Sequence, residues 1–97
     1  MIVPENEQLV LLMLKEGAKY VTAKLKHDYY RSDKPSYRYG KYVVVCDYEE
    51  YEDDDNYHHI AFYTTDGLCV INLEPIKPDG TTLTYDDYIK MKAALDS

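Results

Sequence analysis

Apolar and polar residues alternate along Tyr20–Tyr30, where Val21, Ala23 and Leu25 fall on one face of an extended chain. Threonine and lysine side chains fall on the other face, which is the pattern of a strand with one buried side. Apolar runs bounded by turn-forming residues predict three further strands. These strands cover Tyr42–Tyr48, Tyr57–Thr65 and Leu68–Glu74.

The dipeptide Asp66-Gly67 lies between the last two predicted strands. Asp-Gly between two apolar runs favours a hairpin with a two-residue turn, and such a turn fixes which residues face each other. In this register three pairs share the core face: Thr64 with Cys69, Phe62 with Ile71, and Ile60 with Leu73. His59 is then expected opposite Glu74 on the other face of the sheet.

A first helix is predicted near the N-terminus. It begins around Pro4–Glu7, where a proline and two glutamates suit a helix start, and it ends at Gly17. Leu9–Leu14 is apolar at six consecutive positions, so the helix is apolar on every side, whereas a surface helix shows only a stripe. Either the sheet and the C-terminal segment cover it on two sides, or one side binds a second subunit. A buried strand is the competing interpretation of so short a run.

A second helix is predicted at the C-terminal end. Thr84 can cap its first turn together with Asp87, and Tyr88, Met91 and Leu95 form its apolar side. The element order is therefore α-β-β-β-β-α. The sequence predicts a single α+β domain over residues 1–97, in which both helices pack on one face of a four-stranded antiparallel sheet.

The amino-acid composition adds three expectations. Twelve of the thirteen aromatic residues are tyrosines, more than a core of this size can bury, so several should lie at the surface. Cys46 and Cys69 both have apolar neighbours and stand on strands that are not adjacent, which predicts buried free thiols and a cytoplasmic protein. No signal peptide is visible, and Leu9–Leu14 is the longest apolar run, too short to span a bilayer.

Charge is distributed unevenly along the chain. Residues 1–41 carry eight Lys and Arg against five Asp and Glu, a net +3, whereas residues 77–97 carry three against four, a net −1. Residues 42–76 carry nine acids and no Lys or Arg, a net −9, so the three segments sum to −7. An acidic block of this size repels nucleic acid and anionic membranes and attracts basic protein surfaces.

The acidic block has its peak at Asp47–Asn56, where seven of ten residues are acidic and two are tyrosines. This stretch is expected to be either a solvated connection between the second and third strands or a contact surface for a partner. Acidic and tyrosine side chains together offer charge and rigid contact area. The candidate partner-binding residues are Asp47, Glu49, Glu50, Tyr51, Glu52, Asp53, Asp54, Asp55 and Tyr57.

Metal binding and catalysis have less support. The acidic stretch lacks the glycine and the final glutamate of a calcium loop, and the adjacent His58 and His59 would point to opposite faces of a strand. No nucleophile motif or glycine-rich phosphate loop is present, so we expect no enzyme, no cofactor and no metal.

The pattern therefore favours a non-enzymatic binding protein that docks an acidic, tyrosine-rich surface on a basic partner. In size, charge and tyrosine content the chain resembles small acidic proteins of phages and mobile elements that inhibit nucleic-acid-handling enzymes. That resemblance implies an inhibitor or nucleic-acid mimic.

Two alternatives stay open. One is a small homo-oligomeric module, dimeric through the first helix, with a ligand or partner on the open sheet face. The other is direct nucleic-acid binding through Lys24, Lys26, Arg31 and Arg38, which the acidic block opposes.

Overall fold

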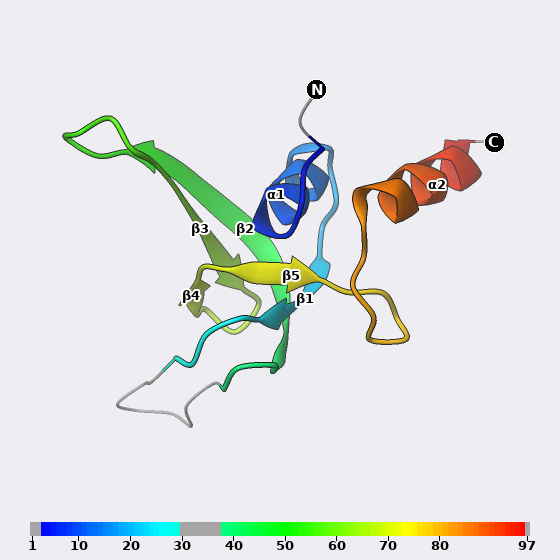
Figure 1. Cartoon of the computed structure of the whole chain (residues 1–97), viewed down its shortest axis with the longest axis horizontal. Coiled ribbons are helices and arrows are strands. Elements are labelled where there is room, and N and C mark those ends of the chain that lie inside the picture. Colours follow the sequence, from blue (N-terminus) through cyan, green and yellow to red (C-terminus); the bar gives the residue numbers. More distant parts are fainter. Residues whose placement is uncertain (1–2, 30–37, 97) are drawn as a thin grey trace.

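The structure, a computed structural model, describes residues 3–29 and 38–96 and contains two helices and five strands (Figure 1). The elements in chain order are α1 (Glu7–Lys15), β1 (Val21–Leu25), β2 (Tyr42–Glu52), β3 (His58–Thr64), β4 (Cys69–Val70), β5 (Leu73–Pro75) and α2 (Tyr85–Asp96). The predicted α+β class is confirmed: along the chain, one helix precedes the antiparallel sheet and one helix follows it. The sheet has five strands where four were predicted.

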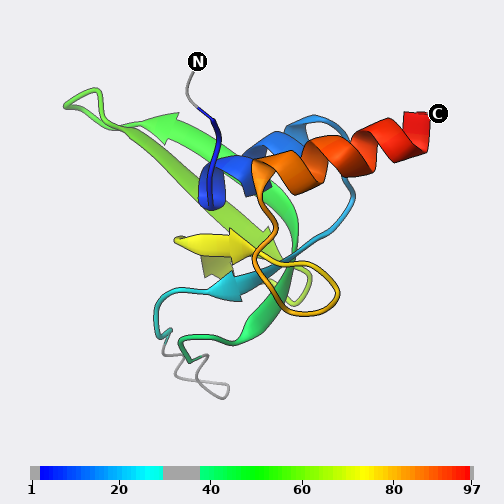
Figure 2. The same ribbon diagram turned by 45° about the vertical axis from the view of Figure 1, so that its right-hand side comes forward.

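The strand order explains the shape of the sheet. All neighbours are antiparallel and follow the order β4-β3-β2-β1-β5, so β4 and β5 occupy opposite edges. Only Ile71 and Asn72 separate these two strands in the chain. Val70 and Leu73 are three residue steps apart and so at most about 10–11 Å from each other, which means that the sheet must curl until its two edges approach each other. Figures 1 and 2 both show β4 and β5 close together.

The fifth strand arises because the predicted strand Leu68–Glu74 is divided in two. The hydroxyl of Tyr29 donates to the carbonyl oxygen of Ile71 at 2.6 Å and accepts the Ile71 N–H at 2.8 Å. Asn72 then adopts a left-handed φ of 56°, which turns the chain away from β3. Its N–H donates to Glu7 at 3.1 Å, and the following residues pair with β1 instead.

The hairpin register predicted from Asp66-Gly67 is wrong by one residue. Tyr63 faces Cys69 and Phe62 faces Val70, because the turn has three residues between Thr64 and Leu68. The Thr64 hydroxyl holds this turn by accepting the N–H of Leu68 at 2.9 Å.

A one-residue shift exchanges the two faces of a strand. Val70 is therefore buried, whereas Ile71 is exposed. The prediction of buried thiols is wrong for both cysteines, which are exposed. At Cys69 the cause is this shift in register. The predicted pairing of His59 with Glu74 is also wrong.

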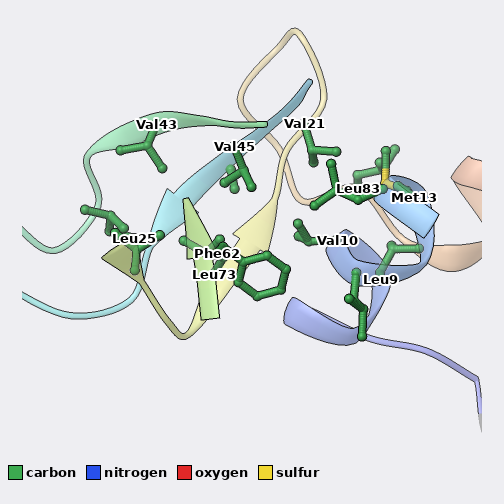
Figure 3. Close-up of a cluster of buried hydrophobic side chains, with 14 of the residues drawn as sticks. Leu9, Val10, Met13, Val21, Leu25, Val43, Val45, Phe62, Leu73 and Leu83 are labelled. Atoms are coloured by element: carbon green, nitrogen blue, oxygen red, sulfur yellow. The ribbon is translucent and has the colours of Figure 1, made fainter. Parts of the chain in front are cut away.

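The core lies between α1 and the concave side of the sheet. Leu9 and Val10 of α1 are fully buried and approach Phe62 of β3 (Figure 3). Leu12 is the one residue of Leu9–Leu14 that is only partly buried. The chain itself therefore covers most of this apolar helix, and dimerisation through it stays a prediction.

Local signals set the end of α1 and the start of α2 as predicted, whereas α1 begins only at Glu7, after Pro4 and Glu5. Gly17, at a φ of 105°, follows the last turn of α1, where the N–H of Ala18 reaches the carbonyl of Met13 at 3.0 Å. At the start of α2, Thr84 and Asp87 cap each other's backbone N–H groups. In the described part of the chain, neither helix is long and apolar enough to cross a membrane.

Candidate functional site

The acidic stretch is a β-ribbon rather than a long loop. β2 continues to Glu52, four residues beyond its predicted end, and pairs with β3 along its whole acidic half. β1 pairs with β2 only as far as Val45, so the ribbon extends beyond the rest of the sheet (Figure 1). We refer to residues 47–61, two strand segments and the turn between them, as the acidic arm.

A β-bulge at the base of the arm determines which residues face outward. The register of β2 against β3 shifts between Val45 and Asp47, leaving Cys46 as the extra residue. Before the bulge, Val43 and Val45 face the core; beyond it, Tyr48 and the even-numbered residues lie on that side. Asp47, Glu49 and Tyr51 consequently share the outer face.

On the inner face of the arm, Glu50 connects the ribbon to α1. Its carboxylate lies 2.9 Å from the ammonium of Lys15 and 3.2 Å from Nε2 of His58. The hydrogen bond to Lys15 is the main reason that the pKa of Glu50 is lowered. Glu50 therefore fixes the position of the arm relative to the core.

On the outer face, aromatic rings and carboxylates alternate across the two strands. The rings of Tyr51 and His59 stack with their centroids 5.0 Å apart and their planes 19° apart. Nε2 of His59 lies 2.8 Å from Asp53. The hydroxyl of Tyr63 donates to Glu49 at 2.7 Å, and this hydrogen bond raises the pKa of Tyr63 to about 12.

Asp53 organises the turn at the tip of the arm. Its Oδ1 accepts the N–H of Asp55 at 2.9 Å and that of Tyr57 at 3.0 Å. The hydrogen bond from His59 and these backbone contacts lower the pKa of Asp53. Asn56 completes the turn with a left-handed φ of 66°. The tip is thus a hydrogen-bonded turn that presents its remaining carboxylates outward.

The left-handed conformation of Asn56 leads to a stability prediction. Asn56→Ala should lower the free energy of unfolding by about 1 kcal/mol, because alanine tolerates this region less well than asparagine. Asn56→Gly should be close to neutral, because glycine adopts positive φ without a steric cost. Urea denaturation of the two variants checks this, and equal stability of both would contradict the left-handed turn.

The nine candidate residues all lie in the arm but divide into two groups. Asp47, Glu49, Glu50, Tyr51 and Asp53 make contacts that shape the ribbon. The others make no side-chain hydrogen bond, ion pair or ring contact with the described residues and are exposed: Glu52, Asp54, Asp55 and Tyr57. These four are the arm's groups most available to a partner.

Sequence reasoning set aside the two histidines, which the structure brings into the site. His58 and His59 do lie on opposite faces, as expected, but each contacts a carboxylate of the arm. The signal that could have found these contacts is the register of β2 against β3, which local patterns do not provide. Among the residues that the structure describes, no three His, Cys, Asp or Glu side chains are placed to hold a metal ion.

Lys24 and Lys26 lie away from the arm, whereas Lys15 pairs with Glu50 in it. Lys24 and Lys26 pair with Glu74 across the neighbouring strands, at 3.8 and 3.1 Å. β2 begins at Tyr42, beside β1, and its 11 residues carry the acidic end away from that region. A strand of this length spans roughly 33 Å. Physiological salt screens exposed charges beyond about 8 Å, so Lys24 and Lys26 do not neutralise the far end of the arm.

A groove of about 370 Å³ is lined by residues from both faces of the sheet and from both helices, among them Thr22, Tyr42, Met13 of α1 and Met91 of α2. It is therefore not a feature of the open sheet face alone. A ligand or partner on that face stays a prediction.

Comparison with known proteins gives no further guidance to the function. No family model matches the chain, and neither the curated proteins nor the solved structures include a significant match.

Proposed function

We propose that the protein is a non-enzymatic binding protein whose acidic arm docks on the basic surface of a nucleic-acid-handling protein and inhibits it. The observation that carries this proposal is the projecting ribbon, on which seven carboxylates stand within nine residues without a lysine or arginine. A ribbon that extends beyond the sheet can enter a concave site that a flat surface cannot reach.

The spacing of these charges supports mimicry of a nucleic-acid strand. The strand part of the arm, residues 47–52, spans roughly 20 Å and carries four carboxylates, which gives one for every ~5 Å, and three more stand at the turn. One strand of a duplex carries one phosphate for about every 3.4 Å of helix axis. A cleft lined with Lys and Arg for phosphates would therefore find a similar density of negative charge on the arm.

Tyrosines supply the short-range part of the proposed contact. Tyr51 and Tyr57 on the arm are 51% and 68% exposed. Long-range attraction by the carboxylates would speed the encounter, and the tyrosines would slow dissociation by packing against the partner. Both cysteines are exposed free thiols, which supports the proposal that the protein acts in the reducing cytoplasm.

The proposal is tested with Asp54→Asn/Asp55→Asn, which removes two exposed charges from the tip. The wild-type protein, immobilised, should capture a basic protein from an extract of its source cells, and added duplex or single-stranded nucleic acid should release it. The double variant should bind the captured protein about tenfold more weakly, with a smaller dependence on salt, because fewer charges attract the partner.

A matched control removes the same charge elsewhere. Glu5→Gln/Asp86→Asn takes two exposed carboxylates from the helix starts, outside the arm, and should leave affinity within about twofold. Equal loss in both double variants would indicate a net-charge effect and contradict docking through the arm. Capture that nucleic acid does not displace would contradict mimicry.

A further inference from the structure

Half of β3 has an unpaired edge. His58–Ala61 pairs with β2 on one side, but β4 pairs with β3 only at Phe62 and Tyr63. No backbone hydrogen bond to another described segment involves His58–Ala61 on its other side. An unpaired strand edge is a ready template for another extended chain.

The phase of the ladder shows which backbone groups are free. Asp53 donates its N–H to the carbonyl of Tyr57 at 3.1 Å, so these two residues form a hydrogen-bonded pair. Such pairs alternate along an antiparallel ribbon, so His59 bonds to β2 whereas His58 and Ile60 point away from it. The N–H of Thr64 donates to the carbonyl of Leu68 at 2.9 Å, so the even-numbered residues of β3 point away from β2 there as well. Each of His58 and Ile60 therefore offers one N–H and one C=O at the free edge.

The edge is vacant because the chain leaves the position beside it. A continuous strand through Leu73 would have run along His58–Ala61, as the sequence pattern suggested. Instead, the Tyr29 hydroxyl holds the backbone of Ile71, and Asn72 turns the chain toward β1. The sheet thus contains an unfilled strand position that continues the line of β4.

Charge decides which occupant this position favours. A second copy pairing edge to edge would bring together two arms that both carry a net negative charge, which repel each other. A basic segment on this edge would lie about 10 Å from β2, with β3 between them, and its long side chains would extend toward the carboxylates of the arm. The edge itself contains the exposed His58 and His59 but no lysine or arginine that would repel a basic segment.

We propose that an extended, Lys- or Arg-rich segment of the partner adds as a strand to the edge of β3 at His58 and Ile60, so that backbone hydrogen bonds accompany the charge contacts. This inference rests on the proposed function, since it specifies how the basic partner binds the arm. Main-chain hydrogen bonds supply affinity in this mode of recognition, and side chains at alternate positions supply selectivity.

The probe for this test is a synthetic heptapeptide in which lysine alternates with valine. The control peptide has the same sequence with alternate D residues, so it carries the same charge but cannot form a regular strand. The all-L peptide should bind about tenfold more tightly, because it alone forms the backbone hydrogen bonds. It should also slow hydrogen exchange at the amide of Ile60, measured by NMR.

Substitution at His58 isolates the backbone contribution. His58→Pro removes an N–H that points away from β2, so the hairpin ladder remains, whereas His58→Ala keeps the N–H and removes the imidazole. Binding of the all-L peptide should fall about tenfold in His58→Pro relative to His58→Ala. If the proline variant folds poorly, slower hydrogen exchange at the Ile60 amide of the wild-type protein still tests whether the peptide adds as a strand.

Other results would overturn the inference in distinguishable ways. Equal binding of both peptides without protection at Ile60 would mean docking by charge alone, which overturns strand addition and leaves the proposed function standing. Failure of both peptides to bind at low salt would count against both. Dimerisation of the protein alone with a protected Ile60 amide would show that a second copy occupies the edge.

Discussion

Phe62→Ala should lower the free energy of unfolding by about 3–5 kcal/mol, the largest effect that we expect from a single substitution. Phe62 is the chain's sole phenylalanine and is fully buried. Its strand neighbours are Tyr48 and Val70, and Val10 of α1 lies close to its ring (Figure 3). Alanine would leave a cavity that α1 and the sheet cannot fill by moving toward each other.

A domain of this length has about 5–15 kcal/mol of stability in total, so this variant should be close to unfolding at 37 °C. Urea denaturation followed by circular dichroism measures the loss. Phe62→Leu is the matched control and should cost about 1–1.5 kcal/mol, since it fills most of the volume. A loss below about 1 kcal/mol for Phe62→Ala would contradict the core position of this residue.

Acidification below about pH 4.5 should destabilise the protein. Six described carboxyl groups have a lowered pKa in the folded state, each held by hydrogen bonds or a nearby cation: Glu16, Glu50, Asp53, Glu74, Asp79 and Asp87. The ordinary values are 4.5 for glutamate and 3.8 for aspartate. The unfolded chain therefore binds more protons than the folded protein in this range.

The sign of the effect follows from that difference. A carboxyl group with a lowered folded pKa stabilises the protein above its unfolded pKa, and the contribution is lost as the pH falls through the folded value. Stability should thus be nearly constant from pH 7 to 5 and fall below that. Urea denaturation midpoints at pH 7, 5, 4 and 3 measure this change in stability.

Two variants test the origin of this acid sensitivity. Glu50→Gln should reduce the loss of stability on acidification, because one carboxylate held by Lys15 is gone. Glu5→Gln should leave the pH profile unchanged, since that side chain makes no hydrogen bond or ion pair with the described residues. A urea midpoint that stays constant from pH 6 to pH 3 would show that these carboxylates do not stabilise the fold.

The acidic arm shows how sequence and tertiary structure share the specification of the candidate site. The count of charges and the exclusion of Lys and Arg are visible in the sequence, and all nine candidate residues lie on one projecting ribbon. Which of the nine residues shape the ribbon and which remain exposed could not be predicted. Glu50 contacts Lys15 from a helix 35 residues earlier, and Asp53 holds the turn, whereas Asp54 and Asp55 are left to solvent.

Features that depend on residues a few positions apart could be predicted from the sequence. The alternation in β1, the glycine that ends α1 and the mutual capping of Thr84 and Asp87 are all of this kind. Their energies come from local backbone geometry and nearby side chains, so a short window of sequence contains the information.

The strand division depends on a contact between distant parts of the chain, whereas the hairpin register and the face of Cys69 depend on a local contact that the Asp-Gly pattern does not contain. The Tyr29 hydroxyl captures Ile71 from 42 residues away, and the Thr64 hydroxyl selects a three-residue turn where Asp-Gly alone favours two. The Tyr29 hydroxyl makes two hydrogen bonds to Ile71 and the Thr64 hydroxyl accepts one from Leu68, and each hydrogen bond is worth about 1 kcal/mol. Because side chains alternate along a strand, a shift of one residue is enough to exchange buried and exposed faces, and it leaves the local pattern unchanged.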